Sequence, residues 1–173
     1  MALSLYDVVI PAFQQTLSGV AETLEVGLKY CQEKGIDLDA LVETRLCPDM
    51  LPFRFQIVSV AHHTQGALEG AKAGTFSPGG RQGPLSYTDL QALIAEARAA
   101  LQALTPEAVN ALEGTDVTFT MGERHIPFRA EGFLLSFSLP NLHFHATTAY
   151  DILRLQGAPV SKRHYLGPLR LKA

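Results

Sequence analysis

Long apolar runs, cysteine pairs and clustered charge are all scarce in this chain of 173 residues. No apolar run approaches the roughly 20 residues that span a bilayer, and the N-terminal MALSLYDVVIPAF contains an Asp and a Pro where a secretory signal would be uninterrupted. We therefore expect a cytoplasmic protein without a membrane partner. Charged residues amount to only 18%, and Lys and Arg are scattered, which argues against a nucleic-acid partner.

Several common chemical motifs are also absent. Cys31 and Cys47 lie sixteen residues apart without a CxxC spacing, so neither a zinc knuckle nor a disulfide framework is indicated, and we expect two buried free thiols. The chain has no GxSxG and no GxxxxGK[ST] sequence. No acid stands at a spacing that would complete a triad with Ser59, Ser136 or Thr148. Nucleophilic catalysis has no support in the sequence.

The length and the apolar content of 47% fit one hydrophobic core, so we expect a single domain over residues 1–173. The first long helix is predicted from Ser4 to about Gln32, since apolar residues recur there at steps of three and four. Ser4 and Asp7 form a capping box at its start, and Gly35 follows its end. The inward face comprises Tyr6, Ile10, Phe13, Leu17, Val20, Leu24, Leu28 and Cys31.

Three further long helices are predicted by the same periodicity. The second begins with an N-cap at Asp49, has Pro52 in its first turn and runs to about Lys72. The third follows a capping box at Thr88 and Gln91, and Thr105 and Pro106 start a short extra helix after it. The last runs over 131–156 with an interruption at Pro140, and its inward residues are Leu135, Leu142, Ala146, Ala149, Ile152 and Leu153.

The remaining segments lack helical periodicity. Residues 75–87 are rich in Gly and Pro and predict an exposed loop. Residues 117–129 alternate around a turn at Gly122–Glu123, which predicts a hairpin of two edge strands lying against the helices. Residues 158–173 predict an extended tail over the helices or over a second subunit. The pattern as a whole predicts a mainly all-α fold, an antiparallel four-helix bundle with a small β-hairpin before its last helix.

Four of the six histidines fall in two groups, one on the second long helix and one on the fourth. At about 100° per residue, His145 points inward with Leu142 and Ala149, whereas His143 lies about 200° away. Asn141 precedes His145 by one turn and shares its face. His62 or His63 can approach from the second helix, but adjacent residues diverge by about 100°, so at most one of them faces the same point.

These residues allow two interpretations. In the first, His145 and Asn141 combine with a histidine of the second helix to bind a divalent metal, with an open position for an activated water. In the second, His145 is a core histidine hydrogen-bonded to a carbonyl or to Asn141, and the remaining histidines lie at the surface. An amide ligand suits Zn or Ni less well than a third imidazole, and the sequence leaves both interpretations open.

Several stretches together resemble an uncharacterised domain-of-unknown-function family within the DinB/YfiT-like group of metalloenzymes. They are the opening LSLYDVVIPAF, the stretch from Cys47 to Gln56, the run LPNLHFHATTAYDILRLQG and the ending SKRHYLGP. Better-known members of the group carry a histidine on helix two and an HxxxHRGQ motif on helix four, followed by Leu-Arg and Gly. Counted back from Leu153–Arg154 and Gly157, His145 matches the second histidine, while Asn141 replaces the first and Ala146-Thr147-Thr148 replaces Arg-Gly-Gln.

The resemblance implies a site formed by His62, Asn141 and His145, with a divalent metal (Zn or Ni) as its cofactor. His62 is preferred over His63 because it falls where the resembled family tends to carry an acidic residue. His63, Thr148 and Tyr150 are candidate pocket residues. The implied activities are metal-dependent hydrolysis or thiol transfer on an unknown small molecule. The high apolar content and the C-terminal tail favour a homodimer. The alternative is a non-catalytic ligand-binding or dimeric interaction module without a metal.

Overall fold

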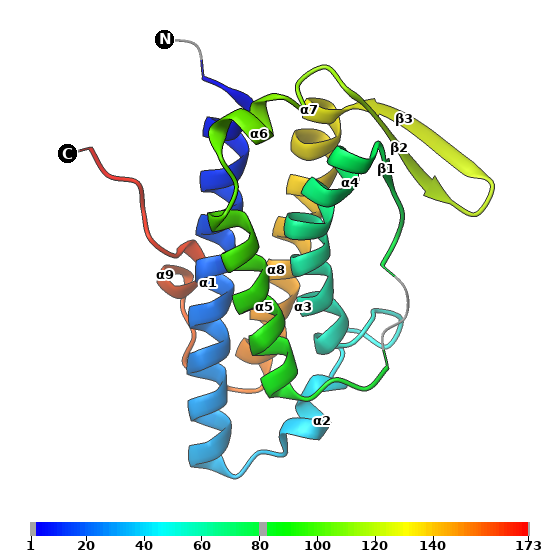
Figure 1. Ribbon diagram of the computed structural model, residues 1–173. Coiled ribbons are helices and arrows are strands. Elements are labelled where there is room, and N and C mark those ends of the chain that lie inside the picture. The colour runs from blue at the N-terminus through cyan, green and yellow to red at the C-terminus, as the bar shows by residue number, and fades with distance from the viewer. Residues whose placement is uncertain (1–2, 80–82, 173) are drawn as a thin grey trace.

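The computed structural model describes residues 3–79 and 83–172, which form a mainly helical fold with one small sheet (Figure 1). The α-helices are α1 (Leu5–Lys34), α2 (Leu38–Val42), α3 (Phe53–Ala61), α4 (Ala67–Ala73), α5 (Tyr87–Gln102), α6 (Pro106–Asn110), α7 (Ala130–Gly132), α8 (Leu139–Leu155) and α9 (Lys162–Leu166). Two π-helical segments, η1 (His62–Gly66) and η2 (Phe133–Ser138), join α3 to α4 and α7 to α8. The predicted mainly helical fold is confirmed.

The long helices surround one core. α1 packs against α5 and α8, and α3 packs against the same two helices, so that each contacts two neighbours (Figure 1). The side chains between them are apolar and almost fully inaccessible, including Phe13, Leu17, Ile57, Ile94 and Leu134. Each such burial stabilises the fold by about 1.5–3 kcal/mol relative to exposure. This core fixes the helices that carry the histidines.

The helix ends follow local capping chemistry. Ser4 and Asp7 form the predicted capping box, and Gly35 ends α1 in the left-handed conformation with φ of 64°. The predicted start of the third long helix is wrong by two residues, because the reciprocal hydrogen bonds join Ser86 and Asp89. The predicted N-cap at Asp49 is also wrong: the N-cap of α3 is Pro52, and it makes no side-chain capping bond.

The predicted interruption at Pro140 does not occur, since the chain passes from η2 directly into α8. A proline ring clashes with the carbonyl four residues before it in a regular α-helix, and the wider π-helical turn ahead of Pro140 relieves that clash. The extra residue of a π turn also shifts the helical phase. Leu135, which was expected to point inward, is consequently 38% exposed.

The sheet has three strands, β1 (Thr75–Phe76), β2 (Asp116–Met121) and β3 (Arg124–Arg129), in that order. The hairpin of β2 and β3 is confirmed, with Met121 opposite Arg124 at the turn. β1 lies within the predicted loop and pairs in parallel with β2, so that β2 is a central strand and the expectation of two edge strands is wrong. Part of that loop, residues 80–82, lies outside the described residues.

The C-terminal segment is not extended throughout, because α9 forms within it and packs on α1. Gly19 makes this packing possible: a Cβ at that position would lie 2.3 Å from the Tyr165 carbonyl oxygen. Of the two free cysteines only Cys31 is buried; Cys47, expected to be buried too, is exposed.

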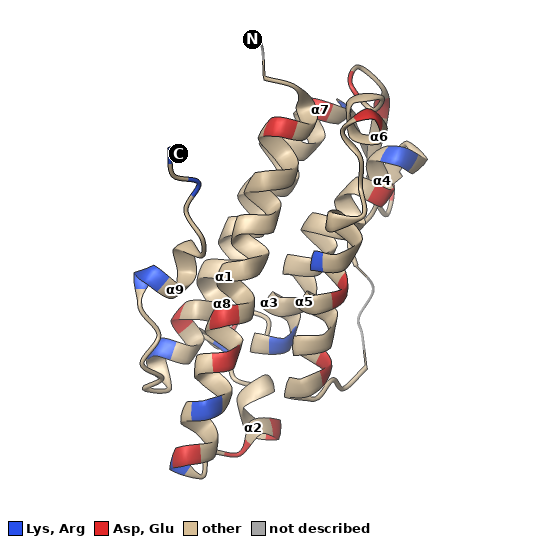
Figure 2. Ribbon diagram, turned by 60° about the vertical axis from the view of Figure 1, so that its left-hand side comes forward, with Lys and Arg blue, Asp and Glu red and all other residues tan. Residues whose placement is uncertain are grey.

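Charged residues are spread over the helices, and both signs occur along α1 (Figure 2). Within the described residues, no helix combines the length and the apolar character that crossing a membrane requires.

Candidate functional site

The histidines of the second and fourth helical stretches meet at one pocket of about 200 Å³. Its polar walls come from η1 and α8, which contribute His62, His63, Asn141 and His145. Its apolar walls come from α3, the sheet and η2, and consist of Phe55, Val58, Phe76, Phe119 and Phe137. Parallel pairing of β1 with β2 places Phe76 beside Phe119, so the small sheet builds one side of the pocket.

His145 is held by a buried glutamine. The Nε2 amide of Gln56 donates to the Leu51 carbonyl oxygen at 2.8 Å, which directs its Oε1 toward Nδ1 of His145 at 2.8 Å. Because Oε1 can only accept, Nδ1 of His145 carries the hydrogen, and Nε2 carries the lone pair. Burial and the neighbouring His62 lower the pKa of His145 to about 4. The imidazole is therefore neutral at pH 7, with Nε2 free to act as a ligand or a base.

His63 lies opposite His145. The ring centroids are 5.8 Å apart, and the ring planes are inclined by only 14°. Nδ1 of His63 is buried and has no hydrogen-bond partner among the described residues. Burial lowers its pKa to about 3, with further contributions from His62 and His145. An unpaired buried ring nitrogen costs about 1–3 kcal/mol, which is the kind of cost that a ligand or ion offsets.

His62 lies on the outer side of the same pocket. Its Nε2 donates to the Ser77 carbonyl oxygen at 2.8 Å, and its ring stacks on Phe76 with centroids 4.3 Å apart. Nδ1 of His62 lies against Gly66. Of the two adjacent histidines, His63 is therefore the one whose ring faces His145.

The remaining predicted residues separate into two groups. Asn141 lines the pocket, and its Nδ2 donates to the Phe137 carbonyl oxygen at 2.8 Å, which leaves Oδ1 as a free acceptor. Thr148 is buried away from the pocket and donates to the carbonyl oxygen of Phe144. Tyr150 lines a separate shallow hollow beside Asp151.

The donor atoms of the pocket fit a borderline divalent cation. His63 and His145 are neutral imidazoles, and Asn141 adds a carbonyl oxygen, a set that suits Zn or Ni better than Mg or Ca. No three His, Cys, Asp or Glu side chains within the described residues are grouped to hold a metal, and Asn141 is the amide that lines the pocket beside the two imidazoles. None of the described residues that line the pocket is charged.

Gln56 was not identified from the sequence, although a signal was present. It occupies an inward position between Phe53 and Val60 on α3 and is only 2% exposed. A polar residue at an inward-facing position of an apolar helix face needs a partner. Here that partner is the histidine across the pocket.

Comparisons with known proteins place these features in a family. The model of the DUF1993 family, a domain of unknown function, matches residues 5–166. A crystal structure of a DinB family member protein from Shewanella denitrificans superimposes with a TM-score of 0.79 over 98% of this chain and 95% of that one, at 21% identity. The search of curated proteins found no match. The neighbour shows a shared fold, and the family match, which covers most of the sequence, shows that the chain belongs to DUF1993.

Proposed function

We propose that this protein is a divalent-metal-dependent hydrolase or thiol transferase on a DinB-like four-helix bundle, with one Zn or Ni ion held by His63, His145 and Asn141. The observation that supports this proposal best is the pair of neutral imidazoles, 5.8 Å apart. One offers a lone pair at Nε2, and the other has a buried ring nitrogen without a partner. His62, expected from the resemblance, serves in this proposal as a wall of the pocket.

A metal in this site would supply Lewis acidity, lowering the pKa of a coordinated water to about 7. The protein contributes orientation and environment. Gln56 fixes the tautomer of His145, as outer-shell partners of metal ligands commonly do. The phenylalanine walls make most of the lining apolar, and the described lining offers no carboxylate to balance a positive charge. That imbalance favours an anionic fourth partner such as hydroxide or a thiolate.

Substitutions of Asn141 are expected to change the affinity for the cation in opposite directions. Replacement by aspartate puts an anionic oxygen where Oδ1 now lies, so Asn141→Asp is expected to bind the cation more tightly, and Asn141→Leu more weakly. Gln56→Leu is expected to reduce affinity by about 10- to 100-fold, the usual effect of losing an outer-shell partner.

The experiment is titration of EDTA-treated protein with Zn²⁺ and Ni²⁺ by calorimetry at pH 7.5, alongside elemental analysis. We expect one ion per chain in the wild type and a loss of at least about 100-fold in affinity in His63→Ala and His145→Ala. His125→Ala, in the exposed hairpin strand β3, is the control. Circular dichroism establishes that each variant is folded. Equal binding in the wild type and the folded His145→Ala variant would overturn the proposal.

A second function is favoured by the aromatic lining. Four phenylalanines, namely Phe55, Phe76, Phe119 and Phe137, surround the pocket, and they suit a small neutral aromatic ligand held by His145 without a metal. In that case titration with Zn²⁺ or Ni²⁺ shows no binding. The wild type binds an aromatic probe such as phenol, and the folded His145→Ala variant does not.

A further inference from the structure

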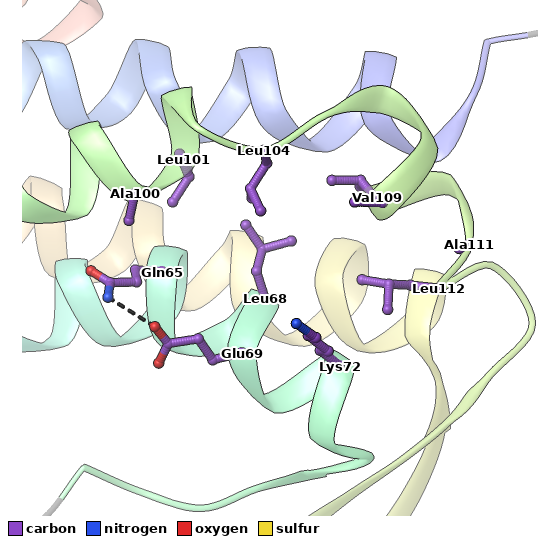
Figure 3. Close-up of a pocket in the computed structure, with 11 residues that line it drawn as sticks. Gln65, Leu68, Glu69, Lys72, Ala100, Leu101, Leu104, Val109, Ala111 and Leu112 are labelled. Atoms are coloured by element: carbon purple, nitrogen blue, oxygen red, sulfur yellow. Dashed lines mark hydrogen bonds between the residues drawn. The ribbon is translucent and has the colours of Figure 1, made fainter.

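The structure has a second pocket, which shares no lining residue with the histidine site. It has a volume of about 480 Å³ and lies between α4, α5 and α6 (Figure 3). Its apolar lining consists of Leu68, Leu101, Leu104, Val109 and Leu112. Volumes of about 300–1,000 Å³ are typical of small-molecule sites.

Small residues keep this pocket open. α5 ends at Gln102, and the chain then turns into α6, which packs against α1. Ala100, Ala108 and Ala111 line the walls between these helices. A longer side chain at any of them would fill the space that now exposes leucine and valine surface.

The polar residues lie on one side of this apolar pocket. Gln65 donates from Nε2 to Oε1 of Glu69 at 2.8 Å, which orients this carboxylate toward Gln65 without removing its negative charge. In Figure 3 the ammonium of Lys72 lies apart from the Gln65–Glu69 pair. Among the ion pairs of the described residues, none involves Lys72. The pocket thus combines an apolar interior with two charged groups of α4, the hydrogen-bonded carboxylate of Glu69 and the ammonium of Lys72, which has no ion-pair partner in the part of the chain that the structure describes.

We infer that this pocket binds a straight-chain monocarboxylate, with the alkyl chain among the leucines and the carboxylate at Lys72. Gln65 and Lys72 are separated by seven helical steps of 1.5 Å, or roughly 10 Å, which matches a chain of about eight to ten carbons. The chemistry follows from complementarity: apolar area is removed from water, and the single charge of the ligand meets the unpaired ammonium.

The test uses the full-length protein and sodium decanoate below its micellar concentration, measured by calorimetry. We expect saturable binding of one decanoate per chain, with affinity rising about fourfold per methylene from hexanoate to decanoate. Decanol, which lacks the charge, is expected to bind about 5- to 10-fold more weakly. Lys72→Gln removes this preference for decanoate, whereas Lys29→Gln, in the last two turns of α1 and outside the pocket lining, retains it.

A cavity-filling variant makes the test independent of charge. Ala108 is exposed, so Ala108→Trp fills the pocket without entering the core, and it is expected to abolish decanoate binding while the melting temperature stays unchanged. The inference is overturned by absence of saturable binding, by equal decanoate affinity in Lys72→Gln, or by tighter binding of decyltrimethylammonium. It is also overturned if sedimentation shows a dimer that Ala108→Trp dissociates, since a second copy would then cover this face.

Discussion

Acid should destabilise the metal-free protein, because protonation of His63 and His145 is less favourable in the folded state than in the unfolded state. The pKa values of His63 and His145 are lowered from 6.5 to about 3 and about 4, chiefly by burial. Between pH 6.5 and pH 4 the unfolded chain therefore binds more protons than the folded one, and stability falls as the pH falls. Above pH 7.5 both states carry neutral imidazoles, and this contribution vanishes.

The magnitude follows from the pH interval. At pH 5, which is 1.5 units below the ordinary value, each histidine costs about 2 kcal/mol at 1.36 kcal/mol per unit. Because His145 is partly accessible, we expect the two together to cost on the order of 2–4 kcal/mol. Most carboxylates stay ionised between pH 5 and pH 7.5 in both states, so the histidines dominate this window.

The assay is urea unfolding of EDTA-treated protein at several pH values between 5 and 7.5, followed by circular dichroism. His63→Leu should reduce the pH dependence, and His125→Gln, in the exposed hairpin, should leave it unchanged. A free energy of unfolding that is the same at pH 5 and pH 7.5 would refute the reasoning, as would an undiminished slope in His63→Leu.

Two further predictions concern local structure. Ser86→Ala should destabilise the protein by about 0.5–2 kcal/mol, because Ser86 caps α5, and Thr88→Ala should have little effect; equal losses in urea unfolding would contradict this assignment. Gly19→Ala places a Cβ 2.3 Å from the Tyr165 carbonyl oxygen, so it should displace α9 and cost about 1–3 kcal/mol. Limited proteolysis near Ser161 should then be faster than in the wild type, and unchanged cleavage would count against the packing of α9 on α1.

Features encoded locally were predictable from the sequence. The capping box at Ser4 lies within four consecutive residues, and the hairpin follows from alternation around Gly122. α1 is recognised by spacing because its buried face repeats at three and four residues over its whole length. Each of these signals involves residues close together in the chain.

The pocket depends on features that local patterns do not contain. η1 and η2 change the helical phase by adding a residue to a turn. A projection at 100° per residue therefore allowed at most one of His62 and His63 to face the site, and it placed Leu135 inward. Both histidines in fact line the pocket. The pairing of β1 with β2 joins Thr75 to Thr118, and two residues are too few to show strand periodicity.

The identity of the ligand set is the central claim, and anomalous diffraction from crystals grown with Zn²⁺ tests it most directly. With data collected above the zinc absorption edge, we predict one anomalous peak per chain, about 2.0–2.1 Å from Nε2 of His145 and in contact with His63. A peak at another place on the chain, or none in crystals of protein saturated with Zn²⁺, would contradict it.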